Sequence, residues 1–78
     1  MPLSSTSRRV AAEVRAEMAR QGFTQTTLAE RINRDQHFIS RRLSGKVAFA
    51  IDELAAIAKA LDVPLAGLLG DEAAEASA

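Results

Sequence analysis

The side chains best suited to bind another molecule lie between Gln25 and Ser44, in the stretch QTTLAERINRDQHFISRRLS. At 100° per residue, a helix that starts at Gln36 carries four polar side chains on one arc. Glutamine can form two hydrogen bonds with adenine, and arginine can form two with guanine, while a serine lets the helix approach closely. The arc therefore predicts a helix that reads base edges in the major groove through Gln36, His37, Ser40 and Arg41.

Side chains suited to phosphate surround this arc. A helix that opens at Gln25 leaves free backbone N–H groups at its start, and such groups bind anions. Hydroxyl groups next to that start, and cationic side chains beside the reading arc, would add further contacts. The candidates for phosphate contact are Thr24, Thr26, Arg34, Arg42 and Lys46.

Catalytic and metal chemistry are not expected from these residues. Asp35, His37 and Ser40 are the residue types of a catalytic triad, but they lie within six residues on one helix, and Asp35 is better placed as a helix cap. The chain has no cysteine and one histidine, so neither a disulfide framework nor a zinc site is expected. We predict no enzymatic activity, no metal and no cofactor.

Charge is distributed unevenly along a chain whose formal net charge is zero. Residues 1–46 contain nine basic and four acidic residues, a surplus of five positive charges, whereas residues 47–78 contain one and six, a surplus of five negative charges. A chain of this kind can present a basic face to phosphate. The alternative is that both halves are ordinary solvated surfaces.

The reading arc needs helices to hold it. Val10, Val14 and Met18 recur every four residues, which predicts a first helix over 7–21 with Ser7 as its cap and Gly22 after its end. A second helix is predicted over 25–32 with Thr24 as its cap. A turn at Asn33, which tolerates a left-handed backbone, leads to a third helix over 36–43 capped by Asp35. The second and third predicted helices are thus two short helices around a tight turn.

The second half of the chain predicts two more helices. One covers 51–61 with Asp52 and Glu53 in its first turn, and a short one follows with Pro64 in its first position and Gly70 at its end. Residues 1–6 are expected to be a flexible arm, residues 7–70 one domain, and residues 71–78 a disordered acidic tail. Some apolar side chains exceed what the core needs, and the candidates for a two-fold contact are Val47, Phe49, Leu65 and Leu68.

About residues 7–70 resemble the helix-turn-helix of the phage repressor and Cro family, also called the xenobiotic-response-element family. Gln25 opens the first helix of the motif, Leu28 and Ala29 supply its apolar and small pair, and Asn33 stands at the turn usually given to glycine. Ile39 takes the buried position of the second helix, and IDELAAIAKALDVPLAGLL is similar to the family's fourth and fifth helices. The resemblance implies an all-α, compact five-helix fold like that of lambda repressor.

The resemblance also implies roles for individual residues. Gln36, His37 and Arg41 match base-reading positions, with Ser40 beside them, and Gln25 matches a residue that touches phosphate and often braces the first reading side chain. The chain departs from the family at Arg34, where the turn is often apolar, and at Arg42, usually a buried aliphatic residue. We expect Arg42 to extend outward toward phosphate.

The leading hypothesis is a regulator of transcription that binds double-stranded DNA in a sequence-specific way. It would be a Cro-like or immunity-type repressor that binds a pseudo-palindromic operator as a homodimer. The alternative is an antitoxin or co-regulator that acts mainly through a protein partner. No apolar run approaches the roughly 18 residues of a membrane span, so a cytoplasmic protein of a bacterium or a phage-infected cell is expected.

Overall fold

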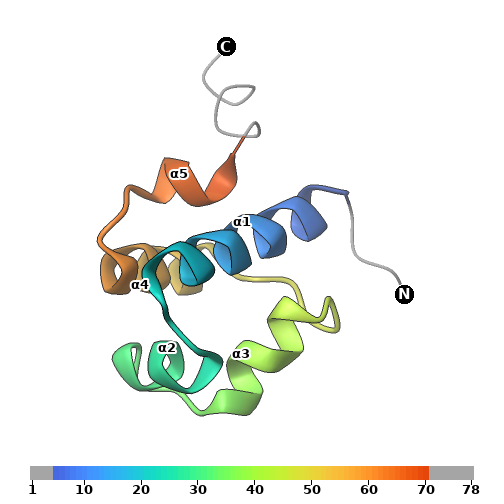
Figure 1. Ribbon diagram of the computed structural model, residues 1–78. Coiled ribbons are helices and arrows are strands. Elements are labelled where there is room, and N and C mark those ends of the chain that lie inside the picture. Colours follow the sequence, from blue (N-terminus) through green and yellow to red (C-terminus); the bar gives the residue numbers. More distant parts are fainter. Residues whose placement is uncertain (1–4, 71–78) are drawn as a thin grey trace.

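A computed structural model describes residues 5–70, which form five helices and contain no strand. The helices are α1 (Ser5–Gln21), α2 (Gln25–Arg31), α3 (Gln36–Leu43), α4 (Ile51–Leu61) and α5 (Leu65–Leu69). The long α1 crosses the middle of the molecule, with α2 and α3 on one side of it and α5 on the other (Figure 1). The five predicted helices and the all-α class are confirmed.

One apolar core joins all five helices. Each helix contributes residues from its predicted apolar stripe, and Val14, Ile39 and Ile57 have no exposed surface. α1 packs against α3, α4 and α5, while α2 packs against α3 and α4. The core residues are Val10, Val14, Met18, Leu28, Ala29, Ile39, Leu43, Leu54, Ile57, Ala58, Leu61 and Leu68.

Local chemistry ends α1 and starts α2 where the sequence predicts. Gly22 adopts a left-handed backbone with φ of 74°. The N–H of Phe23 therefore donates to the carbonyl of Met18 at 2.9 Å, which satisfies an end group of α1. Thr24 caps α2, because its hydroxyl accepts a hydrogen bond from the N–H of Thr27 at 3.1 Å.

The turn between α2 and α3 also follows the prediction. Asn33 has φ of 60°, a left-handed conformation that asparagine adopts more easily than most residues. Asp35 then caps α3 by accepting a hydrogen bond from the N–H of Phe38 at 2.9 Å. α2 ends at Arg31, one residue earlier than expected, with Ile32 as its C-cap.

Two further predicted boundaries are wrong. α1 already includes Ser5, so Ser7 lies inside the helix and is not its cap. Pro64 caps α5 with an extended backbone (ψ of 147°) instead of occupying its first position. Of the expected arm, Ser5 and Thr6 are helical and residues 1–4 lie outside the described part. The expected acidic tail, residues 71–78, also lies outside it.

Candidate nucleic-acid interface

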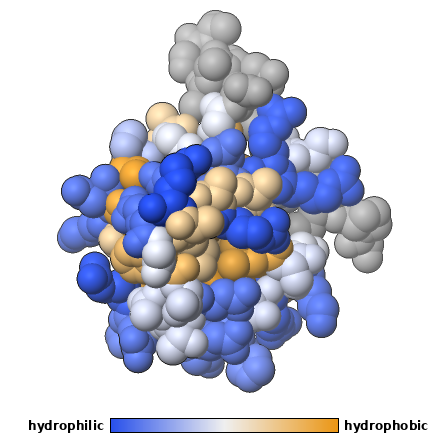
Figure 2. Space-filling view, viewed as in Figure 1, coloured by the Kyte–Doolittle hydropathy of each residue, from blue (hydrophilic) through white to orange (hydrophobic). Residues whose placement is uncertain are grey.

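The polar arc of α3 faces away from the core. Ile39 and Leu43 are buried, whereas Gln36, His37 and Arg41 are exposed and Ser40 is half-buried. The side of the molecule that carries α2 and α3 is mainly hydrophilic in the space-filling view (Figure 2). The structure thus leaves the four candidate reading residues on the outer face of one helix.

Gln25 and Gln36 connect the two helices of the motif. The side-chain N–H of Gln36 donates a hydrogen bond to the side-chain oxygen of Gln25 at 2.6 Å. The contact joins the first residue of α2 to the first residue of α3, although both lie near solvent. It is the bracing that the family resemblance implies, and it restricts the rotation of the first side chain on the reading arc.

The candidate phosphate contacts divide into different environments. Thr26 and Lys46 are exposed, and no described hydrogen bond uses either side chain. The Thr24 hydroxyl is already part of the α2 cap. The guanidinium of Arg34 is exposed and lies over the Phe38 ring, 4.8 Å from its centroid. Thr26, Lys46 and Arg34 can therefore meet phosphate without breaking a cap.

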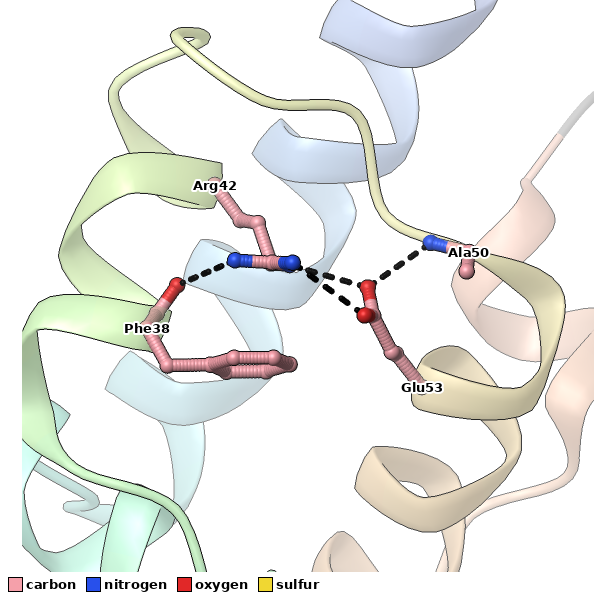
Figure 3. Close-up of polar contacts among 4 residues, drawn as sticks. All are labelled: Phe38, Arg42, Ala50 and Glu53. Carbon is pink, nitrogen blue, oxygen red and sulfur yellow. Dashed lines mark hydrogen bonds and ion pairs between the residues drawn. The ribbon is translucent and has the colours of Figure 1, made fainter.

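Arg42 does not extend outward, and this expectation is wrong. Its guanidinium donates two hydrogen bonds to the Glu53 carboxylate, at 2.9 and 3.2 Å, and one to the carbonyl of Phe38 at 3.1 Å (Figure 3). It also lies flat on the Phe38 ring, 3.7 Å from the centroid. Because only 15% of the side chain is exposed and its guanidinium is paired with Glu53, Arg42 is not free to meet phosphate.

Glu53 joins the reading helix to the helix that follows it. Its carboxylate accepts both bonds from Arg42 and a third from the N–H of Ala50 at 2.8 Å, directly before α4 (Figure 3). The hydrogen bonds from Arg42 lower the pKa of Glu53, while its partial burial acts in the opposite direction. The carboxylate therefore stays ionised and paired over the neutral range.

A second arginine also holds the last turn of α3. Arg15 of α1 donates a hydrogen bond to the carbonyl of Leu43 at 2.5 Å, which satisfies one of the end carbonyls of α3. Sequence reasoning missed Arg15 and Glu53 as partners of the reading helix. The available signal was the position of Arg42, which the family usually gives to a buried aliphatic residue, since a cation there either reaches water or pairs with an acid.

The candidate two-fold contact needs one correction. Leu68 is 1% exposed and belongs to the core, so it cannot contact another molecule in this fold. Val47, Phe49 and Leu65 are half-buried, whereas Ile51, which sequence reasoning did not single out, is 59% exposed. Phe49 and Ile51 line a groove of about 200 Å³ with Val10, Leu54 and Leu69.

No group of three or more histidine, cysteine or acidic side chains within residues 5–70 could hold a metal ion. No helix in the same part of the chain is long and apolar enough to cross a membrane.

The fold and the outward-facing arc on α3 define a helix-turn-helix DNA-binding protein. Residues 14–68 match the sequence model of the helix-turn-helix family, and the chain belongs to this family, that of the Cro and C1 type. The resemblance to phage repressor and Cro proteins is thereby confirmed. The chain is placed among DNA-binding transcription regulators, which are normally not enzymes.

Solved structures agree with this placement. The chain is similar to the clp gene regulator ClgR of Corynebacterium glutamicum, with 26% identity over 97% of each chain and a TM-score of 0.80. It is also similar to the restriction-modification controller protein C.Esp1396I, with 25% identity over 94% of this chain and 99% of that one, and a TM-score of 0.80. The controller C.AhdI of Aeromonas hydrophila shares the fold at 20% identity over 82% and 93% of the two chains, with a TM-score of 0.76. No curated protein sequence matches the chain.

Proposed function

We propose that this protein binds a specific double-stranded operator and represses transcription by occupying it, in the manner of a Cro-like or immunity-type repressor. The observation that carries the proposal is the exposed arc of Gln36, His37 and Arg41 on a helix whose opposite face is buried. Gln36 and Arg41 supply the two side-chain types that bind adenine and guanine with paired hydrogen bonds. The similarity to a gene regulator and to restriction-modification controllers supports a regulatory role.

Phosphate contacts would fix the position of this arc on the duplex. The proposed contacts are the start of α2, at Gln25 and Thr26, together with Thr24, Arg34 and Lys46. Such contacts carry no sequence information, but they set the register and make the affinity depend on salt. The proposal places the protein in the cytoplasm, where operator DNA is accessible.

The protein is proposed to act as a homodimer on a pseudo-palindrome. Two reading helices about one helical turn apart, roughly 34 Å, would match half-sites separated by about 10 base pairs. The exposed Ile51 and the neighbouring Phe49 are the side chains that we now propose for the two-fold contact, with Val47 and Leu65 at its margin. A leucine or isoleucine side chain left in water costs about 2 kcal/mol relative to burial, which favours covering Ile51.

Selection of bound duplexes from a random library tests the proposal, because it returns the operator sequence and the half-site spacing together. We expect a two-fold symmetric sequence and an affinity that falls steeply between 50 and 200 mM salt, by about 10³-fold or more if six or more phosphates are contacted. Binding that is equally tight at both salt concentrations, or no enrichment of any sequence, would contradict the proposal.

The exposed apolar groove beside Ile51 supports a second candidate, an antitoxin or co-regulator that holds a partner protein there. Co-purification of the untagged protein from its native cell discriminates between the two. A stoichiometric partner that masks Ile51 would favour the second candidate. A self-contained dimer that binds its operator without a partner would favour the repressor.

A further inference from the structure

We propose that the Arg42–Glu53 ion pair is a positioning device that sets the angle of α3, and thereby the ability of the protein to distinguish its operator from other DNA. This inference rests on the proposed function, since it concerns how the same reading arc is held. Neither residue faces DNA in this proposal. Both act through Gln36, His37 and Arg41, whose positions depend on how α3 is held. α3 packs on α1 and α2, and the Arg42–Glu53 pair links it to α4.

The geometry of the pair is suited to fixing an angle. Two parallel N–H donors of one planar guanidinium meet the two oxygens of one carboxylate, at 2.9 and 3.2 Å. A two-pronged contact of this kind restricts rotation as well as distance, which a single hydrogen bond does not. The side chains are 15% and 18% exposed, so water competes for the contact less than at an open surface.

The pair is also fixed at both ends. On α3, the guanidinium is held by the carbonyl of Phe38 at 3.1 Å and by the face of the Phe38 ring at 3.7 Å. On α4, the carboxylate is held by the N–H of Ala50 at 2.8 Å. A shift of the last turn of α3 would therefore break contacts at the start of α4 as well (Figure 3).

The pair complements the contact at the opposite end of the reading helix. Gln25 holds Gln36 at the first turn of α3, and the link from Glu53 holds Arg42 at its last turn. Ile39, between these two points, and Leu43, directly after Arg42, seat the helix in the core, but apolar contacts have no direction and permit small tilts. The directional contacts at the two ends, which include the hydrogen bond from Arg15 to the carbonyl of Leu43, are what fix the tilt.

The test compares Glu53→Gln with Asp52→Asn in the full chain. Asp52 is a neighbouring carboxylate in the same first turn of α4, but it is exposed and does not bond Arg42, so the two variants change net charge equally. Affinities for the selected operator and for an unrelated duplex of equal length are measured at the same salt. The temperature is one at which circular dichroism shows both variants folded.

Glu53→Gln should lower the ratio of operator to unrelated-duplex affinity by about tenfold, the scale of one two-pronged base contact. Asp52→Asn should leave this ratio within about twofold of the wild-type value, because a change of charge alone alters both affinities alike. Equal ratios for Glu53→Gln and Asp52→Asn would overturn the inference. If the wild-type protein selects no operator, the proposed function itself fails, which is a different result.

Arg42→Lys keeps the inference testable if Glu53→Gln does not fold. Lysine preserves the charge and one hydrogen bond but not the planar two-pronged contact. We expect the ratio to fall by several-fold while the affinity for unrelated DNA is unchanged, because no phosphate contact is lost. A wild-type ratio for Arg42→Lys would show that the paired geometry does not set the angle.

Discussion

Truncation of the buried face of α3 should lower the stability of the fold, whereas truncation of its exposed face should weaken the sequence preference in DNA binding. Ile39→Ala and Gln36→Ala test these two effects. Ile39 has no exposed surface and lies in the core cluster, whereas Gln36 is exposed at the first turn of the same helix. Ile39→Ala removes three carbon atoms from the centre of the domain. At about 0.8 kcal/mol for each carbon, the lost transfer free energy is about 2.4 kcal/mol, and a residual cavity brings the total to about 2–4 kcal/mol.

That loss is large for a chain of this size. A domain of 78 residues has a free energy of unfolding of about 4–12 kcal/mol. Since 1 kcal/mol corresponds to about 4–8 °C for such a domain, Ile39→Ala should lower Tm by at least about 8 °C. Ile39→Val, which removes one carbon, should cost only about 0.5–1.5 kcal/mol. Comparing wild type, Ile39→Val and Ile39→Ala therefore separates a graded loss of packing from a general loss of structure.

Gln36→Ala serves as the matched control on the same helix. It loses the 2.6 Å hydrogen bond to Gln25, an exposed contact, so its effect on the free energy of unfolding should stay below about 1 kcal/mol. Its effect on DNA should be large, with the sequence preference at one base pair relaxed by about 1–3 kcal/mol. Thermal and urea unfolding measure the first quantity, and competition binding measures the second. A Gln36→Ala variant as unstable as Ile39→Ala would refute the assignment of the two faces.

Substitutions at four further positions have defined outcomes. Lys46→Ala should weaken binding to operator and unrelated duplex alike and reduce the slope of log affinity against log salt by about 0.9, measured by salt titration. Asn33→Ala should cost about 1 kcal/mol because φ is 60°, whereas Asn33→Gly should not, as urea unfolding would show. Ile51→Lys should leave Tm nearly unchanged but weaken self-association in sedimentation, because the side chain is 59% exposed. Arg42 lowers the pKa of Glu53, so the stabilisation from this carboxylate is fully present above the unfolded-state pKa of about 4.3. It is lost as the pH falls through the lower pKa of the folded state. The difference in the free energy of unfolding between wild type and Glu53→Gln should therefore shrink in acid.

The parts of the fold that depend on local chemistry could be predicted from the sequence. Thr24 and Asp35 cap helices through their own side chains, and Asn33 turns the chain through its own backbone angle. Each of these effects involves residues at most three positions apart, so the sequence contains the information directly. For the same reason the bounds of α3 agree with the prediction, and so does the assignment of its inner and outer faces.

The apolar residues of the second half show where local patterns stop being sufficient. Leu65 and Leu68 both follow Pro64 at helical spacing, and periodicity alone does not say which one faces α1. In the structure Leu68 is buried while Leu65 is only half-buried, because α5 is a single short turn whose orientation is set by its contacts with α1 and α4. Ile51 lies on the apolar stripe of α4, but at the start of the helix it remains outside the core and 59% exposed. Its position on the stripe alone would have predicted burial.

Arg42 shows why a charged side chain is harder to place from the sequence than a helix. Taken alone, an arginine at a buried position has two solutions: its charge can reach water, or it can find an acid inside. Glu53 lies in the first turn of α4, where the helix dipole alone accounts for an acidic residue. The sequence therefore gives no separate sign that Glu53 also pairs with Arg42. The structure shows that one carboxylate serves both purposes, because its oxygens accept from Ala50 and from Arg42 together. Where a family position changes from aliphatic to arginine, the informative question is therefore which carboxylate on the facing helix can pair with it.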